Sequence, residues 1–421
     1  MKTQYLITAS FLSVFLLFNC FFISASDPVS YYTISGKVKD KKNKKKIEYV
    51  NVYAVGTNIG TITNEDGEFQ LKLDNALRIS EIELSALGYY NNRVSISNSD
   101  LLNQTFYLTP QSFQLSEVEV FSWQNPRDLV KAAIEKIDVN YSLNPNLLTG
   151  FYRETIQKGR RYINISEAVV QVYKNPYDKN IKRDRVQVLK GRKLISPKPN
   201  DTLNVKLLGG PNMAVEVDIV KNPDILLDEE SLQFYRYRMG ETTSINDRLQ
   251  YVVHFEPQVI ASIPLFKGTF YIDRETLAFT RAEFGFDMKD KKKVTEIILK
   301  EKPKGLRFSP EDVSYVVTYK QHNNKTYFNY LRTEIKFKCD WKRRLFATTY
   351  TVIGETVITD NQEENAIQIA SKDSFKKRQS LSDEAMTFYD ENFWGGYNII
   401  EPTESLENAV NKLRKEQSKN Q

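Results

Sequence analysis

Apolar and polar side chains alternate along several stretches of the chain, as expected for β-strands that bury one face. From residue 333 to 339, Thr, Ile, Phe and Cys alternate with Glu and Lys, and the same period returns at 346–352 after a turn near 342–344. Residues 269–284 predict two further strands around a turn at 274–276. These runs predict one large, curved antiparallel sheet in the second half of the chain.

Shorter strands precede this sheet. Six runs rich in β-branched and aromatic residues lie at 33–38, 49–55, 68–73, 81–85, 93–97 and 105–108, and a seventh follows at 116–120. Strands of this length and spacing are typical of two packed sheets. The fold class is therefore mainly β, with a seven-stranded Greek-key β-sandwich ahead of the larger sheet.

Helical spacing indicates three helices. Asn125 can cap a helix that begins at Pro126, and apolar residues at 130, 133, 134 and 137 give that helix one apolar face. Residues 371–391 are charged and predict a second helix. Leu406, Ala409, Val410 and Leu413 define a final short amphipathic helix, and the tail from Arg414 is expected to fray.

Five segments follow from these patterns. They are a signal peptide at 1–26, a β-sandwich at 27–120, a linker and helix at 121–146, a curved antiparallel sheet domain at 147–368 and a helical C-terminal tail at 369–421.

The N-terminus is typical of an export signal. Lys2 precedes an almost wholly apolar run at 5–23, and cleavage is expected near Ala25 or Ser26, where small residues suit a signal peptidase. Two alternatives stay open: the run is long enough to remain as an uncleaved anchor, and Cys20 stands where a lipoprotein would be acylated. Either alternative would attach the exported protein to a membrane, whereas cleavage would release it into the periplasm.

Charge and cysteine content narrow the classes of function. The chain has 59 basic and 53 acidic residues, and its net charge of +6 falls to +5 once Lys2 leaves with the signal. Such an excess over 421 residues argues against nucleic acid as a partner, because nucleic-acid readers concentrate positive charge on one face. Seven lysines at 37–46 predict a solvated hairpin loop, with a lipid or polyanion contact as the alternative. If Cys20 is removed, Cys339 alone cannot form an intrachain disulfide.

A series of glycine turns and short strands in the first segment carries a family resemblance. The matching stretches are ISGKV at 34–38, VNV at 50–52, GT at 56–57, GTITNEDGEF at 60–69 and LGY at 87–89. They resemble the carboxypeptidase regulatory-like family, a transthyretin-like β-sandwich of bacterial envelope proteins, over about residues 32–120. The resemblance implies a module without catalytic residues that presents or docks its neighbour. The chain departs from the family at Asn64, where Asp is usual, and at 47–48, where a proline is usual.

Backbone and side-chain geometry gives a reason for several residues of this first segment. Gly56 and Gly60 suit tight bends, and Phe69 would point into the sandwich core. Residues 64–67, Asn-Glu-Asp-Gly, resemble part of a calcium loop, but the later bidentate glutamate is missing. We therefore expect a hairpin turn there and no metal.

Few residues offer catalytic or metal-binding chemistry. The chain has two histidines, whereas a zinc peptidase needs a cluster of histidines and carboxylates around its metal. His254 and Glu256 would share one face of a strand and could ligate a metal together, although an ordinary strand position is favoured. His322 lies in a turn and is expected at the surface. We find no phosphate-binding loop, nucleophile elbow or dinucleotide fingerprint, and we expect no enzyme activity and no cofactor.

The second domain has a shorter resemblance. Its helix and long strands, including 268–273 and 277–283, look like the half-barrel of periplasmic lipoprotein carriers, which wrap a curved sheet around an apolar cavity. The expected function is non-catalytic binding or scaffolding in the periplasm or at the outer membrane, with an envelope protein as partner. The first alternative is a carrier of a lipid or other hydrophobic ligand, and the second is a hydrolase with a non-standard site. An open apolar cavity would favour the carrier, and a face plugged by the chain's own helices would favour the scaffold.

Overall fold

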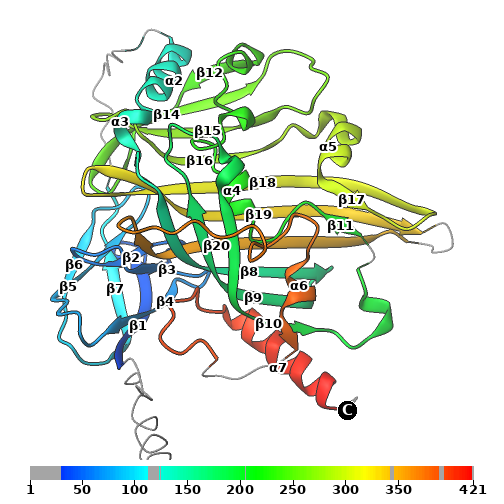
Figure 1. Cartoon of the computed structure of the whole chain (residues 1–421), viewed down its shortest axis with the longest axis horizontal. Helices are drawn as coiled ribbons and strands as arrows, with labels where there is room; N and C mark the ends of the chain where they lie inside the picture. The colour runs from blue at the N-terminus through cyan, green and yellow to red at the C-terminus, as the bar shows by residue number, and fades with distance from the viewer. Residues whose placement is uncertain are drawn as a thin grey trace, which may run out of the picture.

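The computed structural model describes residues 30–111, 123, 125–203, 205–341, 346–387 and 393–419. The expected signal peptide with Cys20 and the expected strand at 116–120 lie outside these residues. The described chain is mainly β, as predicted, with two small N-terminal sheets followed by one large sheet (Figure 1). No helix in these ranges is long and apolar enough to cross a bilayer.

The N-terminal module, defined here as residues 30–111, is a sandwich of seven strands in two sheets. The strands are β1 (Tyr31–Asp40), β2 (Asn51–Ala54), β3 (Gly60–Ile62), β4 (Glu68–Asp74), β5 (Glu81–Ser85), β6 (Asn92–Ser95) and β7 (Leu101–Leu108). One sheet has the order β4-β1-β7 and the other β3-β2-β5-β6. Inward-facing side chains of both sheets, among them Phe69, form one buried core. Six expected strands are confirmed, and β3, which has only three residues, was missed.

The large sheet has the order β12-β14-β15-β16-β18-β19-β20-β8-β9-β10-β21, with β13 paired to β14. Its strands are β8 (Asn146–Lys158), β9 (Arg161–Lys174), β10 (Arg185–Ile195), β12 (Tyr235–Met239), β13 (Thr243–Ile245), β14 (Arg248–Pro257), β15 (Phe266–Asp273), β16 (Phe279–Phe286), β18 (Leu306–His322), β19 (Lys325–Trp341), β20 (Thr348–Gln362) and β21 (Met386–Thr387). The pairings are antiparallel except that between β10 and β21. A separate pair joins β11 (Lys206–Leu207) to β17 (Leu299–Glu301).

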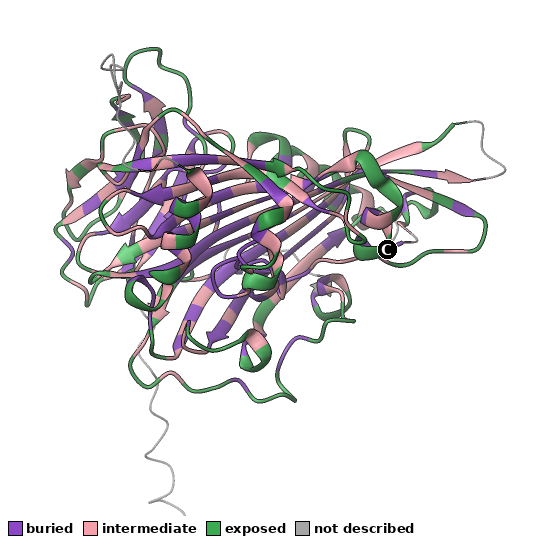
Figure 2. Cartoon of the chain, turned by 90° about the horizontal axis from the view of Figure 1, so that it is seen from above, coloured by how far each residue is buried: buried purple, intermediate pink, exposed green. Residues whose placement is uncertain are grey.

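The predicted alternation is confirmed on β19. Ile335, Phe337 and Cys339 are buried, whereas Lys336 and Lys338 are exposed. Figure 2 shows buried residues running along the strands of the large sheet. We call the face that carries Phe337 the inner face and the opposite one the outer face.

Short helices and loops cover the inner face, whereas α7 packs on the outer face. The α-helices are α2 (Pro126–Glu135), α3 (Ile137–Asn140), α4 (Met213–Glu216), α5 (Lys291–Ile298), α6 (Leu381–Glu384) and α7 (Glu404–Ser418), and the 3-10 helices are η1 (Ile181–Arg183), η2 (Pro199–Asp201), η3 (Pro223–Ile225), η4 (Ser231–Phe234) and η5 (Met288–Asp290). The expected cap of α2 is present, because the Asn125 side chain accepts a hydrogen bond from the Arg127 amide at 3.1 Å.

The C-terminal part differs from its prediction. Residues 371–380 form turns instead of the expected helix, and only α6 is helical before β21. The Phe375 amide donates to the Val186 carbonyl of β10 at 2.7 Å, so this segment follows an edge strand and does not close helical turns. The final helix α7 is confirmed, with Leu406 and Leu413 packed on Ile165 of β9, but it continues to Ser418 where fraying was expected.

Candidate functional site

The inner face of the large sheet, where a carrier would hold its ligand, is filled by the chain's own side chains. The residues that cover it are buried members of one core: Leu129, Val130, Met213, Val217, Ile219, Leu226, Leu227, Val294 and Ile298. They pack on aromatic residues of the sheet such as Phe270, Phe279 and Phe337. This plugged face is the arrangement expected of a scaffold.

A polar group of residues, which we call the Asp218 cluster, lies within this core. The fully buried Asp218 accepts hydrogen bonds from Lys174 Nζ at 2.6 Å, Tyr319 at 2.8 Å and Tyr177 at 3.1 Å. Lys174 Nζ also donates to the Ala214 carbonyl at 2.9 Å. Burial, reinforced by the negative charge of Asp218, raises the pKa of both tyrosines. Because these groups satisfy one another, the cluster fixes one packing of α4 on the sheet.

Sequence reasoning missed the Asp218 cluster, although a local signal was present. Residues 217–221 read Val-Asp-Ile-Val-Lys, so two charged residues interrupt an apolar run. Charged residues in such a run are buried only when they are paired. The partners of Asp218 on β9 and β18 are far away in the sequence and could not be identified without the fold.

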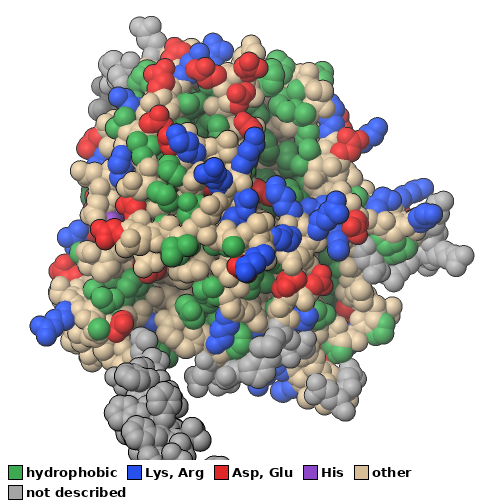
Figure 3. Space-filling model, in the orientation of Figure 1, with side chains coloured by type: hydrophobic (Ala, Val, Ile, Leu, Met, Phe, Trp, Pro, Cys, Tyr) green, Lys and Arg blue, Asp and Glu red, His purple; other side chains and the backbone are tan. Residues whose placement is uncertain are grey.

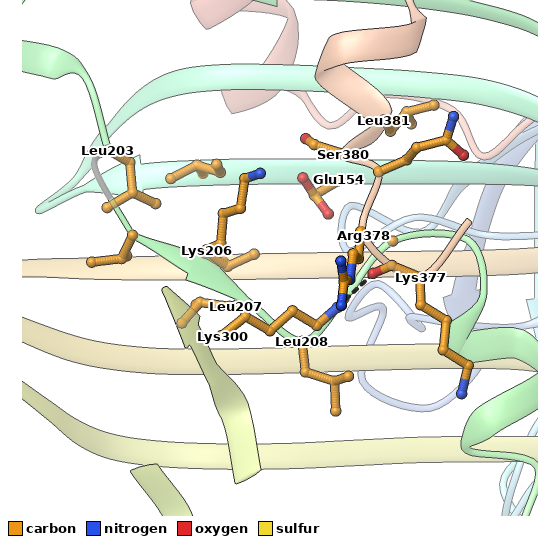
Figure 4. Close-up of a pocket in the computed structure, with 16 residues that line it drawn as sticks. Glu154, Leu203, Lys206, Leu207, Leu208, Lys300, Lys377, Arg378, Ser380 and Leu381 are labelled. Carbon is orange, nitrogen blue, oxygen red and sulfur yellow. Dashed lines mark hydrogen bonds between the residues drawn. The ribbon is translucent and has the colours of Figure 1, made fainter. Parts of the chain in front are cut away.

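A small pocket opens beside α6 on the inner side of the sheet (Figure 4). Its cavity is about 110 Å³, and its walls include the apolar side chains of Ile156, Leu203, Leu207, Val352 and Leu381. Four cationic residues line it as well: Lys206, Lys300, Lys377 and Arg378. We call it the basic pocket. Figure 3 shows Lys and Arg side chains gathered over this part of the surface.

Backbone pairing brings these cations together. β11 supplies Lys206 and pairs with β17, which supplies Lys300. Lys300 Nζ then donates to the Lys377 carbonyl at 2.9 Å, and Lys377 Nζ forms an ion pair with Glu216 at 2.9 Å. Burial lowers the pKa of Lys300, and the neighbouring Lys377 and Lys206 lower it further against the opposing effect of Glu216. Arg378 forms no ion pair with any residue in the described ranges.

A carboxyl group belongs to the same pocket. Glu154 extends from β8 between Lys206 and Arg378 (Figure 4). Its Oε2 accepts a hydrogen bond from the Tyr152 hydroxyl at 2.9 Å, and burial raises the pKa of Glu154. Within the described part of the chain, Glu154 forms no ion pair with the pocket cations. The pocket therefore presents several positive charges above one carboxyl group whose pKa is raised by burial.

The two histidines lie apart from this pocket. His254 and Glu256 share the outer face of β14 as expected, but each has its own partner: Thr269 Oγ1 lies 2.9 Å from His254 Nδ1, and Arg236 lies 3.5 Å from Glu256. Burial, with a smaller effect of Arg238, lowers the pKa of His254. His322 ends β18 and is half-buried where a surface position was expected. No group of three or more metal-ligating side chains occurs among the residues that the structure describes.

The calcium-like segment is a tight turn, but it does not close the expected hairpin, because the strands that it joins, β3 and β4, lie in different sheets. Asn64 Oδ1 accepts hydrogen bonds from the amides of Asp66 and Glu68, each at 2.9 Å. Asn64 Nδ2 donates to the Pro402 carbonyl at 3.0 Å, and the Asp66 carboxylate accepts from the Glu404 amide at 3.0 Å. The turn is thus a contact to the C-terminal segment. The family usually has Asp at this position. The asparagine found here uses its side-chain N–H group for the hydrogen bond to Pro402.

The N-terminal module docks on the outer face of the large sheet, and we call this contact the module interface. Its apolar part is one buried cluster that joins the module to the sheet and the C-terminal segment: Ile62, Phe151, Val169, Tyr330, Val357, Phe393, Trp394 and Ile400. Its polar part centres on Asn329, which accepts a hydrogen bond from the Tyr53 hydroxyl and donates to Asn51 Oδ1 at 3.1 Å. A contact of this kind fixes the module relative to the sheet.

The C-terminal segment before α7 reinforces the module interface. Thr61 Oγ1 donates to the Ile399 carbonyl at 2.9 Å, and the Lys72 amide donates to Asn398 Oδ1 at 2.7 Å. From the sheet, Arg153 donates to the Ile400 carbonyl at 2.8 Å. The segment therefore lies between the two domains and bonds to both.

The buried groups of the module interface that lack a hydrogen-bond partner among the described residues include Trp394 Nε1 and the charged Lys320 Nζ. Lys320 Nζ is buried, lies 3.1 Å from the centroid of the Tyr53 ring and has no hydrogen-bond partner among the described residues. Burial lowers the pKa of Lys320 to about 7, against the attraction of Glu83 and Asp360.

Comparison with known proteins identifies the module. Residues 34–120 match the family model described as CarboxypepD_reg-like domain. No curated protein matches the chain. Matching solved structures include a DUF1329 family protein from Desulfovibrio piger, at 10% identity over 58% of this chain and 95% of that one with a TM-score of 0.25. They also include a LolA superfamily protein from Nitrosomonas europaea, at 11% identity over 59% of this chain and 99% of that one with a TM-score of 0.22. Neither structural likeness is strong enough to bear on function, whereas the family match shows that the N-terminal module is a CarboxypepD_reg-like domain.

Proposed function

We propose that the chain is a non-catalytic binding protein of the bacterial cell envelope, in which the CarboxypepD_reg-like module and the large sheet form one rigid scaffold. The module interface carries the proposal, because apolar packing and hydrogen bonds hold the module in one position. A fixed arrangement lets both domains present a single surface to an envelope partner. The apolar export signal at 5–23 supports the envelope location.

The packing of the inner face supports a scaffold over a carrier. Ligand pockets for drug-sized molecules measure about 300–1,000 Å³. The basic pocket measures about 110 Å³, too small for an acyl chain, and the chain's own core fills the inner face. A larger hollow of about 870 Å³ is lined by charged residues that include Arg236, Arg238 and Glu256, which do not suit an apolar ligand.

Native mass spectrometry with lipid extraction, on protein purified from envelope fractions, separates the scaffold from the carrier. We expect a single ligand-free mass. A co-purifying lipid in stoichiometric amount would contradict the scaffold and favour the carrier. The same mass reports whether the chain is cut near Ala25 or acylated at Cys20.

Hydrogen exchange tests the rigid contact. Trp394→Ala removes an aromatic side chain from the buried interface cluster, so we expect faster exchange in β2 and β3 of the module. Phe346→Ala is the matched control, because Phe346 is 83% exposed and is not a member of the buried interface cluster. Unchanged exchange in Trp394→Ala would show that the module is not held by this contact.

A further inference from the structure

We propose that the basic pocket binds a phosphate-bearing ligand. Lys206, Lys300, Lys377 and Arg378 surround one cavity of about 110 Å³. A phosphate group carries about −1.5 to −2 charges and three strong acceptor oxygens, so its recognition needs several cationic donors. The site lies on the inner side of the sheet and is separate from the module interface on the outer face.

The convergence of the cations argues for an anion as occupant. Like charges that share a site repel one another. Burial has the largest effect in lowering the pKa of Lys300, Glu216 opposes it, and Lys377 and Lys206 each lower it further. Within the described ranges, Glu216 is the one carboxylate that pairs with these cations, and it contacts Lys377. Lys206, Lys300 and Arg378 are left without an ion pair there. A bound anion would offset their repulsion.

The size and the lining of the basic pocket favour phosphate over a larger anion. The cavity has room for a group of a few heavy atoms with water, since one water molecule takes about 30 Å³ of liquid volume. The Glu154 carboxyl in this pocket would donate to a phosphate oxygen when it is neutral and repel the phosphate when it is ionised. Apolar walls at Leu203 and Val352 would accept the neutral part of a phosphate ester. A free phosphate and the headgroup of a phosphomonoester lipid share this chemistry.

Free phosphate as the ligand is tested by calorimetric titration of the full mature protein with inorganic phosphate, at constant ionic strength and pH 8. A lipid headgroup is tested by sedimentation with phosphatidylcholine vesicles that contain phosphatidic acid. The pocket variant is Lys300→Gln/Arg378→Gln. Its control is Lys291→Gln/Lys292→Gln, which removes the same charge from the exposed side of α5, outside the pocket.

We expect the pocket variant to weaken binding at least about tenfold, the effect of losing one charge-assisted hydrogen bond, and the control to change it less than about twofold. Glu154→Gln keeps the shape and a donor but cannot ionise, so it should bind more tightly than the wild type at this pH. Lys206→Gln is a second pocket variant in case the double variant fails to fold, and thermal unfolding checks both.

Saturable phosphate binding that only the pocket variants lose would assign the site to free phosphate. Vesicle binding that the pocket variants lose, without phosphate binding, would assign it to a lipid headgroup. Absence of both, or an equal loss in the control, overturns the proposal. That result would leave the scaffold untouched, because the module interface does not include these residues.

Discussion

The Asp218 cluster and the module interface each bury a lysine, but they surround it differently. Lys174 in the cluster has a carboxylate at 2.6 Å and a carbonyl at 2.9 Å. Lys320 in the interface has the face of Tyr53 and no hydrogen-bond partner among the described residues. A buried charge costs free energy unless it is paired and hydrogen-bonded. The core of the sheet is therefore fixed by complementary charges, whereas the interface carries an electrostatic cost that depends on pH.

The largest effect is expected from breaking the Asp218 cluster, in which the buried charges are paired. Asp218→Ala leaves Lys174 buried without its carboxylate, so the free energy of unfolding should fall by about 3–5 kcal/mol. Urea denaturation followed by circular dichroism measures the loss. Asp178→Ala is the control, because Asp178 pairs with Lys179 at the surface. It should lower the free energy of unfolding by less than about 1 kcal/mol. Equal losses in the two variants would contradict a special role for the cluster.

At Lys320 we expect a smaller change in the free energy of unfolding, and here the substitution should stabilise the protein. Lys320→Met removes an unsatisfied amine and should stabilise the protein by about 1 kcal/mol at pH 6. The pKa of Lys320 is about 7 in the folded protein, below the ordinary value of 10.5. The unfolded chain thus binds more protons between these values, and wild-type stability should rise with pH in this window.

The advantage of Lys320→Met should therefore shrink between pH 7 and pH 9.5 in denaturation curves measured at each pH. Glu83 and Asp360, the carboxyl groups that act on Lys320, remain in both proteins. Lys336→Met on the exposed side of β19 provides the control and should show no such trend. A constant difference between wild type and Lys320→Met would mean that Lys320 does not titrate in this range.

The smallest effect concerns one hydrogen bond of the interface. Asn64→Asp keeps the acceptor of the turn between β3 and β4 but loses the donor to the Pro402 carbonyl. It should lower the free energy of unfolding by about 1 kcal/mol in thermal or urea unfolding. Asn43→Asp is matched to it, because Asn43 also caps a turn through Oδ1, to the Lys45 amide at 2.8 Å. No loss in Asn64→Asp would show that water replaces the Pro402 contact.

Local periodicity explains which parts of the fold were predictable. The alternation at 333–339 and the cap at Asn125 were readable because each depends on neighbours in sequence. β3 was missed because its three residues are too few to show a period. The helix expected at 371–391 failed because Phe375 bonds to β10, a tertiary contact that overrides local propensity.

The candidate site was less predictable than the fold. Lys206, Lys300 and Arg378 come from separate segments. The β11–β17 pairing brings the two lysines together, and the bond from Lys300 to the Lys377 carbonyl holds the segment that carries Arg378. An apolar inner face also looks the same in sequence whether it is open or filled. The residues that fill it, such as Leu226 and Leu227, lie in a loop without periodicity. Carrier and scaffold could therefore be separated only by the packing.

The C-terminal segment at the module interface has a consequence for the order of folding. Thr61 and Asn64 bond to Ile399 and Pro402, partners 338 residues away along the chain. Contacts of such long range form late, since closing the loop between them costs entropy that only the completed contact offsets. Until these contacts form, the buried cluster around Ile62 lacks the part that Trp394 and Ile400 contribute. Folding intermediates in that state expose apolar surface that proteases and chaperones recognise, so the contacts of residues 398–402 mark the folded protein.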